Sequence, residues 1–281
     1  MKEVFDMKVK AFVEKHRKPL RVIAAVIAFA MIAVLLEFAN ELLGNPVSYL
    51  VAKHNAKKYV AENYADEGYV VKDASYFFKF KDYAVHVAKP DGEDCQFLVY
   101  YNMFGAFRGD NYESLVGNGE NVRTRLDMSY RELVKSVLES PANPYNKENA
   151  IQYGRLIFES DEAVDKGFDY GFGLSRDILI PDKQYDIAEL GARGGLLKFS
   201  ADIHGEATAE KAAETLLDVA EFMERGGAPF YAIDLMLESS DGDYYIVENF
   251  LRSDIYEDGL VERVRSVGMT EDEYNARGET K

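Results

Sequence analysis

The sequence has 281 residues, which is enough for one or two domains beside a membrane segment. Hydrophobic residues make up 47 % of it, so a packed core can form, and the formal net charge is −16. The first 43 residues carry seven basic and five acidic side chains, a sum of +2, so the rest carries −18. Because an acidic surface is repelled by phosphate backbones, nucleic acid is excluded as an expected partner.

A long apolar run near the amino terminus predicts a helix that crosses a membrane. Every residue from Val22 to Leu36 is apolar, a stretch of about 22 Å as a helix, against the ~30 Å of a bilayer core. No helix breaker occurs before Gly44, and residues 22–43 together reach about 33 Å. We therefore expect residues 22–43 to contact the lipid bilayer as a transmembrane anchor.

Two other interpretations of this run are a cleaved signal peptide and a buried helix of a soluble protein. Signal peptidase requires small residues at positions −3 and −1, and the best candidate, Glu37-Phe38-Ala39, places Glu at −3. A soluble helix would need a polar face, which the run lacks. An uncleaved anchor is the favoured interpretation.

Charge on the two sides of the run predicts its orientation. All seven basic residues of this region precede it, whereas Glu37 and Glu41 follow. Because basic segments stay on the cytoplasmic side, we expect residues 1–21 to be a cytoplasmic basic tail. The protein is then a single-pass protein of the cell membrane with the bulk of its chain extracytoplasmic.

Residues 44–140 are expected to form a first α+β domain. Asn45-Pro46 is typical of a helix start, and apolar residues then follow at helical spacing. Three β-like runs joined by short connections predict an antiparallel meander. A second helix is indicated by the spacing of Leu126, Tyr130, Leu133 and Val137.

A linker at residues 141–146, with two prolines and two asparagines close by, leads into a second α+β domain at 147–269. Its expected elements are a strand in IQYGRLIFES, a strand in GLLKFSADI, a helix from Ala209 to Met223, a hairpin around Asp241-Gly242 and a last helix from about Asp254 to Val267. Residues 270–281 are polar and are expected to be a disordered tail. The predicted fold class is α+β: one amino-terminal transmembrane helix followed by two small domains, each an antiparallel sheet packed on helices.

The common signatures of catalysis and of metal binding are missing from the sequence. The four histidines are scattered, and HExxH, the phosphate loop, GxSxG, SxxK and the EF-hand pattern do not occur. The single cysteine, Cys95, allows no intramolecular disulfide and lies in the β-like run CQFLVYY, where we expect a core residue. No catalytic residue, cofactor or metal site is therefore expected.

The predicted hairpin offers weak candidates for a polar site. A two-residue turn at Asp241-Gly242 would place Asp234 opposite Asn249 and Leu235 opposite Glu248. Glu248 would then be partly desolvated among apolar neighbours, a condition common at functional sites. Strand-end solvation or a contact to a helix amino terminus is the structural alternative.

Two stretches carry a family resemblance: GNPVSYLVAKHNAKKYVAENY, and PFYAIDLMLE continued by IVENFLRSDIYEDGLVERV. With them the chain resembles the YfjL-like family from the span to about Val264. The resemblance implies small membrane-anchored proteins of Gram-positive bacteria with two outer α+β parts. It carries over no catalytic residue.

Three functions remain open from the sequence. The leading hypothesis is a non-enzymatic extracytoplasmic module that binds a protein, a peptide or another envelope component. The alternatives are a carboxylate-dependent envelope hydrolase and a small-ligand binder with a pocket between sheet and helix. A pocket lined by tyrosine with a converging carboxylate would favour the alternatives, whereas filled sheet faces would favour the first.

Overall fold

The structure is a computed structural model that describes residues 17–145, 150–159 and 170–279. Its contacts divide the chain into two compact units. The first comprises Met1–Gly92 and Gln96–Tyr112, and the second Glu93–Cys95 and Glu113–Lys281. Most of the expected basic tail, residues 1–16, lies outside the described residues.

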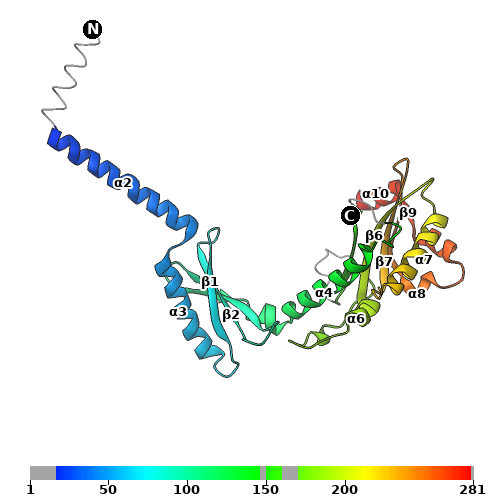
Figure 1. The fold of residues 1–281 in the computed structure, drawn as a ribbon, viewed down its shortest axis with the longest axis horizontal. Helices are drawn as coiled ribbons and strands as arrows, with labels where there is room; N and C mark the ends of the chain where they lie inside the picture. Colours follow the sequence, from blue (N-terminus) through cyan, green and yellow to red (C-terminus); the bar gives the residue numbers. More distant parts are fainter. Residues whose placement is uncertain (1–16, 146–149, 160–169, 280–281) are drawn as a thin grey trace, which may run out of the picture. The chain divides into compact units, whose positions relative to one another are not determined.

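Two helices and a four-stranded sheet make up the first unit (Figure 1). These elements are α2 (Arg17–Leu43), α3 (Pro46–Asn63), β1 (Val70–Phe77), β2 (Asp82–Ala88), β3 (Gln96–Asn102) and β4 (Phe107–Asp110). The strands follow one another in the order β1-β2-β3-β4, and every neighbouring pair is antiparallel. The expected meander is confirmed.

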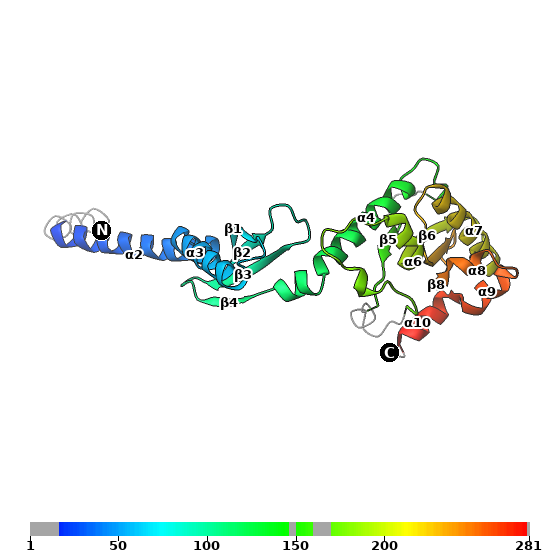
Figure 2. The same ribbon diagram turned by 90° about the horizontal axis from the view of Figure 1, so that it is seen from below.

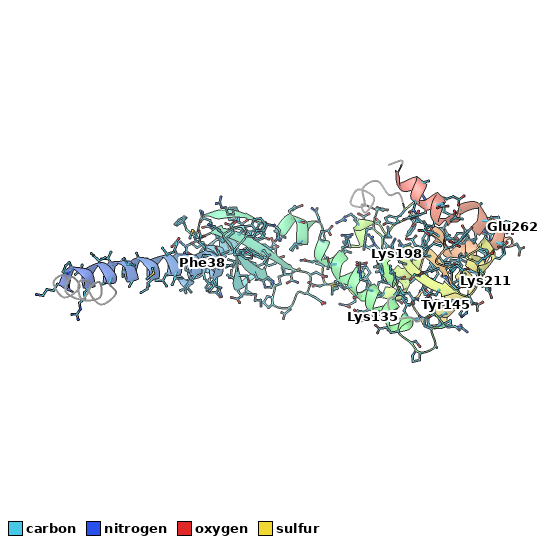
Figure 3. The ribbon with its side chains drawn as sticks, turned by 90° about the horizontal axis from the view of Figure 1, so that it is seen from above. Phe38, Lys135, Tyr145, Lys198, Lys211 and Glu262 are labelled. Atoms are coloured by element: carbon cyan, nitrogen blue, oxygen red, sulfur yellow. The ribbon has the colours of Figure 1, made fainter. Side chains whose placement is uncertain are left out.

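Helix α2 is long enough to cross a membrane and leaves its apolar side chains uncovered. Phe38, labelled in Figure 3, is 63 % exposed. Among the described residues, one helical stretch, Arg21–Asn63, passes the length and composition test for a membrane span. The predicted end of this helix at Gly44 is confirmed, because Gly44 has a φ of 70°. The next helix begins directly after it, where the Asn45 side chain accepts a hydrogen bond from the backbone N–H of Ser48 at 2.8 Å.

Helix α3 packs on one face of the first sheet. Its buried positions are small: Ser48, Ala52 and Ala56 have almost no exposed surface, which lets the helix backbone approach the strands. Past its end, aromatic rings 4.7–6.0 Å apart fill the remaining space. This cluster consists of Tyr64, Tyr69, Phe97 and Tyr112.

The second unit is built on a five-stranded sheet with helices on it (Figure 2). Its elements are the π-turn η1 (Glu113–Gly117), α4 (Glu120–Leu138), β5 (Gln152–Leu156), the 3-10 turn η2 (Arg176–Ile178), α6 (Ile187–Gly194), β6 (Gly195–Ile203), α7 (Ala209–Arg225), β7 (Ala232–Ser239), β8 (Tyr244–Leu251), α8 (Arg252–Ile255), α9 (Leu260–Val267), β9 (Met269–Thr270) and α10 (Glu271–Glu279).

This second sheet is mixed, so the expectation of two antiparallel sheets is wrong for the second unit. The strand order is β5-β6-β7-β8-β9, and β6 pairs with β7 in parallel. The physical reason is α7, which connects the two strands. A helical crossover returns the chain to the end at which the first strand began, whereas an antiparallel pair needs only a short turn.

The inner face of the second sheet holds the main core. Leu197, Phe199, Leu235 and Val247 are at most 2 % exposed there and pack with buried residues of α4, α6 and α7. Because α4 packs on β5 and α6, the contacts divide the chain near Tyr112, whereas the sequence placed the first domain at 44–140. The expected linker 141–146 therefore lies within the second unit.

The carboxyl-terminal part is more ordered than the sequence suggested. The expected disordered tail contains β9 and α10 up to Glu279, and residues 280–281 lie outside the described part. The expected last helix is two helices, α8 and α9, separated by Gly259 at a φ of 78°. A residue with that backbone angle cannot continue an α-helix.

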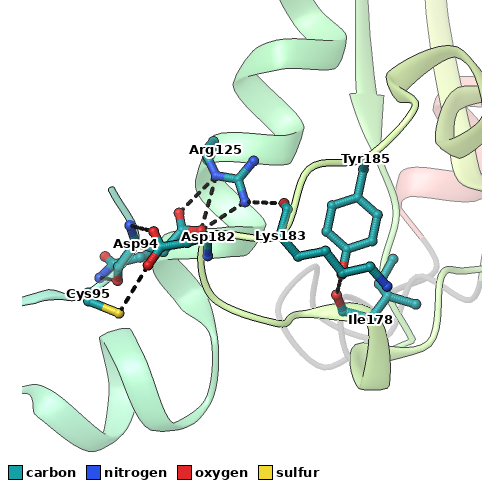
Figure 4. A network of polar contacts seen from close by, with 8 residues as sticks. Asp94, Cys95, Arg125, Ile178, Asp182, Lys183 and Tyr185 are labelled. Carbon is teal, nitrogen blue, oxygen red and sulfur yellow. Dashed lines mark hydrogen bonds and ion pairs between the residues drawn. The ribbon is translucent and has the colours of Figure 1, made fainter. Parts of the chain in front are cut away.

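A buried ion pair holds Glu93–Cys95 within the second unit (Figure 4). Asp94 is 2 % exposed and accepts from Arg125 Nε at 2.9 Å and from Nη2 at 2.8 Å. The backbone N–H of Asp182 donates to Asp94 at 2.8 Å, and that of Asp94 donates to Asp182 at 3.0 Å. Cys95 is buried, as expected, and its Sγ donates to Asp182 at 3.5 Å.

Candidate functional site

A pocket lies on the outer face of the second sheet, where α10 covers part of the strands. It encloses about 200 Å³ and is partly open to solvent. Its lining comes from β6, β7, β8, α10 and the residue before β5: Ile151, Lys198, Phe199, Ser200, Asp234, Leu235, Met236, Ile246, Glu248 and Tyr274. Apolar and charged groups therefore share one concave surface.

Strand alternation explains why these side chains share the outer face. Along β6, Leu197 and Phe199 enter the core, so Lys198 and Ser200 point to the other side. The parallel register places Lys198 beside Asp234 and Ser200 beside Met236. The outer face thus carries two polar side chains on β6, and one polar and one apolar side chain beside them on β7.

Lys198 and Asp234, which both line the pocket, form an ion pair. Lys198 Nζ lies 2.6 Å from Asp234 Oδ2, and the two side chains are 35 % and 16 % exposed. Burial alone would lower the pKa of Lys198, but the charge of Asp234 and its hydrogen bond outweigh burial and raise that pKa above 10.5. Lys198 therefore stays cationic at neutral pH; Figure 3 labels it.

A β-bulge in β8 brings Asp234 and Asn249 together. Asn249 has a φ of 50°, and its backbone N–H donates to Asp234 Oδ1 at 2.8 Å. The bulge leaves one residue of β8 without a partner in the ladder, and the carboxylate satisfies its N–H. Asn tolerates this left-handed conformation better than most residues, which gives Asn249 a structural role.

The predicted register is wrong between the turn and the bulge, whereas beyond the bulge Ile233 pairs with Phe250, as that register requires. Leu235 pairs with Val247, not with Glu248, and the register changes between Ile233 and Leu235. The turn is also longer than expected, because Ser239 N donates to Asp243 O across three residues. Gly242 at a φ of 88° fits the usual three-residue hairpin loop with a left-handed last position.

Glu248 and α10 form the open wall of the pocket. Arg277 Nη1 lies 3.0 Å from Glu248 Oε2, and the side chain of Glu248 is 20 % exposed. Tyr274, one helical turn before Arg277, lines the pocket and is 40 % exposed. The side chain of Glu248 is therefore mostly buried and lies beside the Arg277 guanidinium.

The part of the chain that the structure describes contains no cluster of metal ligands. No group of three or more His, Cys, Asp or Glu side chains there is arranged to hold a metal ion. The site offers cations, carboxylates, a hydroxyl group and apolar contacts, which suit recognition of a small molecule.

Comparison with known protein families finds a match in the amino-terminal part of the chain. Residues 19–108 match the family model of the YfjL-like, N-terminal domain. The chain contains a YfjL-like N-terminal domain. No curated protein and no solved structure matches the chain significantly.

The YfjL-like domain corresponds to helix α2, α3 and the first sheet, up to the start of β4. The predicted family is thereby confirmed on its first motif. The second motif, in β7 and β8, lies beyond the matched residues and stays a resemblance. The pocket lies in the second unit, so the YfjL-like domain contributes none of its lining.

Outside the YfjL-like domain, the sequence indicated part of the pocket. Asp234 and Glu248 line it as candidates, whereas Asn249 lies at the adjoining bulge. Lys198 was missed, although it is the only charged residue inside the apolar run GLLKF, which is a usable signal. Tyr274 and Arg277 left no signal, because they come from a segment that the sequence predicted to be disordered.

Proposed function

We propose that the chain is a membrane-anchored, non-enzymatic protein whose second unit binds a small ligand between the sheet and α10. The observation that carries this proposal is the pocket itself, in which Tyr274 and the carboxylates of Asp234 and Glu248 converge over an apolar floor. Its volume of about 200 Å³ is below the ~300–1,000 Å³ of sites for drug-sized ligands, so the ligand must be small. Sheet faces filled by packing would have favoured a surface that binds proteins.

The arrangement of charges favours binding over hydrolysis. Asp234 accepts from Lys198 and from the backbone of Asn249, and Glu248 accepts from Arg277. A carboxylate-dependent hydrolase needs one carboxyl group placed to exchange a proton with the substrate. Here both carboxylates pair with cations of the protein, an arrangement that suits recognition of a charged ligand.

The pocket chemistry points to a zwitterionic ligand. Each of its two ion pairs presents a cation beside a carboxylate, and Met236 and Ile246 supply apolar contact. A ligand ammonium can pair with Asp234 or Glu248 while a ligand carboxylate pairs with Lys198 or Arg277. A free amino acid or the end of a short peptide in the cell envelope has this chemistry.

The binding proposal is tested by filling the pocket. The full chain in lipid nanodiscs is titrated calorimetrically with the standard amino acids and a set of dipeptides. We expect at least one to bind, and Ile246→Trp, which fills the floor, to weaken that binding more than about tenfold, a loss of roughly 1.4 kcal/mol. The matched control is Tyr244→Trp, on the same strand but outside the lining. Equal affinity in wild type and Ile246→Trp contradicts the proposal, as does a set in which nothing binds.

The anchor part of the proposal rests on α2. Its uncovered apolar surface suits lipid, and basic residues Lys18 and Arg21 stand at its start. We propose that residues 22–43 span the cell membrane with the amino terminus in the cytoplasm and both compact units outside.

Thiol labelling of intact cells tests this orientation. In a Cys95→Ser background, Ser240→Cys places a thiol on the exposed β7–β8 loop and Lys18→Cys places one at the start of α2. A membrane-impermeant maleimide should label Ser240→Cys before lysis and Lys18→Cys only after it, both on a full-length chain in the membrane fraction. The reverse pattern would show the opposite orientation, and a soluble, shortened chain would show a cleaved signal.

A further inference from the structure

Large apolar side chains are exposed at one end of the first sheet, beside the α2–α3 junction. Six of them are between 64 % and 83 % exposed. They come from the end of α2, the first turns of α3, the β1–β2 loop and the β3–β4 loop, and we call them the junction patch: Leu43, Val47, Leu50, Phe78, Phe80 and Phe104. Exposed apolar groups gathered in this way mark an interaction surface.

Direct contacts hold the β1–β2 loop at the level of the last turn of α2. Lys81 Nζ lies 2.6 Å from Glu41 Oε1. Tyr76 Oη donates to the backbone carbonyl of Glu41 at 3.0 Å, and Asn45 N donates to Tyr83 Oη at 2.7 Å. A Cβ at Gly44 would lie 2.7 Å from the Tyr76 ring, so the junction itself is closely packed on the strands.

The β3–β4 loop is held at the same junction. Ser48 Oγ donates to the backbone carbonyl of Met103 at 2.6 Å. A Cβ at Gly105 would lie 2.5 Å from Val51 Cγ1. Phe104 lies between Met103 and Gly105 in the chain, so the contacts of these two residues with the start of α3 place Phe104 next to the junction.

The position of the junction along α2 sets its depth in a membrane. A bilayer core about 30 Å thick is crossed by about 20 residues of helix. A span that begins at Val22 therefore reaches the edge of the hydrocarbon core near Glu41. The junction patch, which adjoins Glu41, then lies at the boundary between the acyl chains and the headgroups.

The two ends of the first sheet differ in charge. Lys79 and Lys81 stand among the phenylalanines of the β1–β2 loop. At the opposite end, the exposed residues of the connecting loops include Asp66, Glu67 and Asp91. Basic and aromatic groups favour a lipid surface, whereas the acidic end is repelled by anionic headgroups.

We propose that the junction patch inserts into the headgroup–acyl boundary of the bilayer that α2 spans, with Lys79 and Lys81 at the lipid phosphates. The lipid surface is the expected occupant, because the β1–β2 loop contacts the last turn of the apolar helix α2. The β3–β4 loop contacts the first turns of α3, which begins three residues after α2 ends. This inference rests on the proposed transmembrane role of α2. It gives the YfjL-like domain a second membrane contact, which fixes the sheet against the bilayer.

The absence of tryptophan from the sequence makes a depth measurement possible. Three single-tryptophan variants of the full chain are reconstituted into vesicles of phosphatidylcholine and phosphatidylglycerol: Phe78→Trp in the patch, Phe29→Trp within α2, and Asp91→Trp at the opposite end of the sheet. Each is measured with lipids brominated at defined carbons and with aqueous iodide. We expect blue-shifted emission and bromolipid quenching for Phe78→Trp, at a shallower depth than for Phe29→Trp, and iodide quenching alone for Asp91→Trp.

The other outcomes separate the two proposals. Bromolipid quenching of Phe29→Trp but not of Phe78→Trp overturns the patch insertion and leaves the span intact. Equal bromolipid quenching of Phe78→Trp and Asp91→Trp also overturns it, because the contact would not be specific to this end. If Phe29→Trp itself is unquenched by bromolipid, the span fails, and the patch insertion fails with it.

Discussion

Replacement of Arg125 by methionine is expected to lower the free energy of unfolding of the second unit by about 3–5 kcal/mol. The guanidinium meets Asp94 through two nitrogens, and the carboxylate is 2 % exposed (Figure 4). Methionine keeps much of the side-chain volume but leaves a buried charge without its cation. Urea unfolding of the full chain in nanodiscs, followed by circular dichroism, measures the change.

The matched control for Arg125→Met is Arg131→Met, which lies on the same helix α4. Arg131 pairs with Asp127 at 2.8 Å, but its side chain is 50 % exposed, so water screens the pair. This control should cost no more than about 1 kcal/mol. The double variant Asp94→Asn with Arg125→Met should recover part of the loss, because no buried charge remains. Equal effects at Arg125 and Arg131 would contradict the structural role of the buried pair.

The sequence was most informative where local periodicity decides structure. The stripes of α3 and α4 and the small residues of α7 predicted helices that the structure contains, and Asn45-Pro46 predicted the start of α3. These signals depend on residues three or four positions apart, so no tertiary information is needed to detect them. The same holds for the meander of the first sheet, in which short connections dictate antiparallel pairing.

Pairings between segments that are far apart in the sequence were harder to predict from the sequence. The order strand, helix, strand from Gly195 to Ser239 already implied a parallel pair, and recognising that crossover would have placed the strands that carry Lys198 and Asp234 side by side. The bulge at Asn249 was different, because its positive φ is set by the Asp234 carboxylate and by the three-residue turn together. No local signal specifies that combination.

The candidate site shows the same division between near and distant residues. Asp234 and Glu248 could be proposed because a single hairpin relates them. Tyr274 and Arg277 reach the pocket only after α10 folds back over the sheet, and the polar composition of that segment gives no apolar stripe to detect. A functional hypothesis from the sequence therefore found two carboxylates of the pocket lining and missed α10, which covers the pocket.

Replacement of Gly191 by alanine is expected to destabilise the second unit by about 3 kcal/mol, the upper end for overpacking. Gly191 lies within α6, where alanine normally stabilises a helix by roughly 0.5–1 kcal/mol. Here an added Cβ would lie 2.3 Å from Tyr130 Cε2 and 2.6 Å from the carbonyl oxygen of Pro229. Tyr130 cannot withdraw, since it is fully buried and donates to that same oxygen at 3.0 Å.

The sign of this change separates packing from helix propensity. A Cβ added at Gly154 or at Gly195 would also lie less than 3.0 Å from the Tyr130 side chain, so glycines surround the ring on more than one side. Ala192→Gly in the same helix is the propensity control and should cost about 0.5–1 kcal/mol. If propensity governed α6, Gly191→Ala would raise the urea midpoint. We expect it to lower the midpoint by more than the control does, because the ring, the carbonyl and the helix backbone compete for one volume.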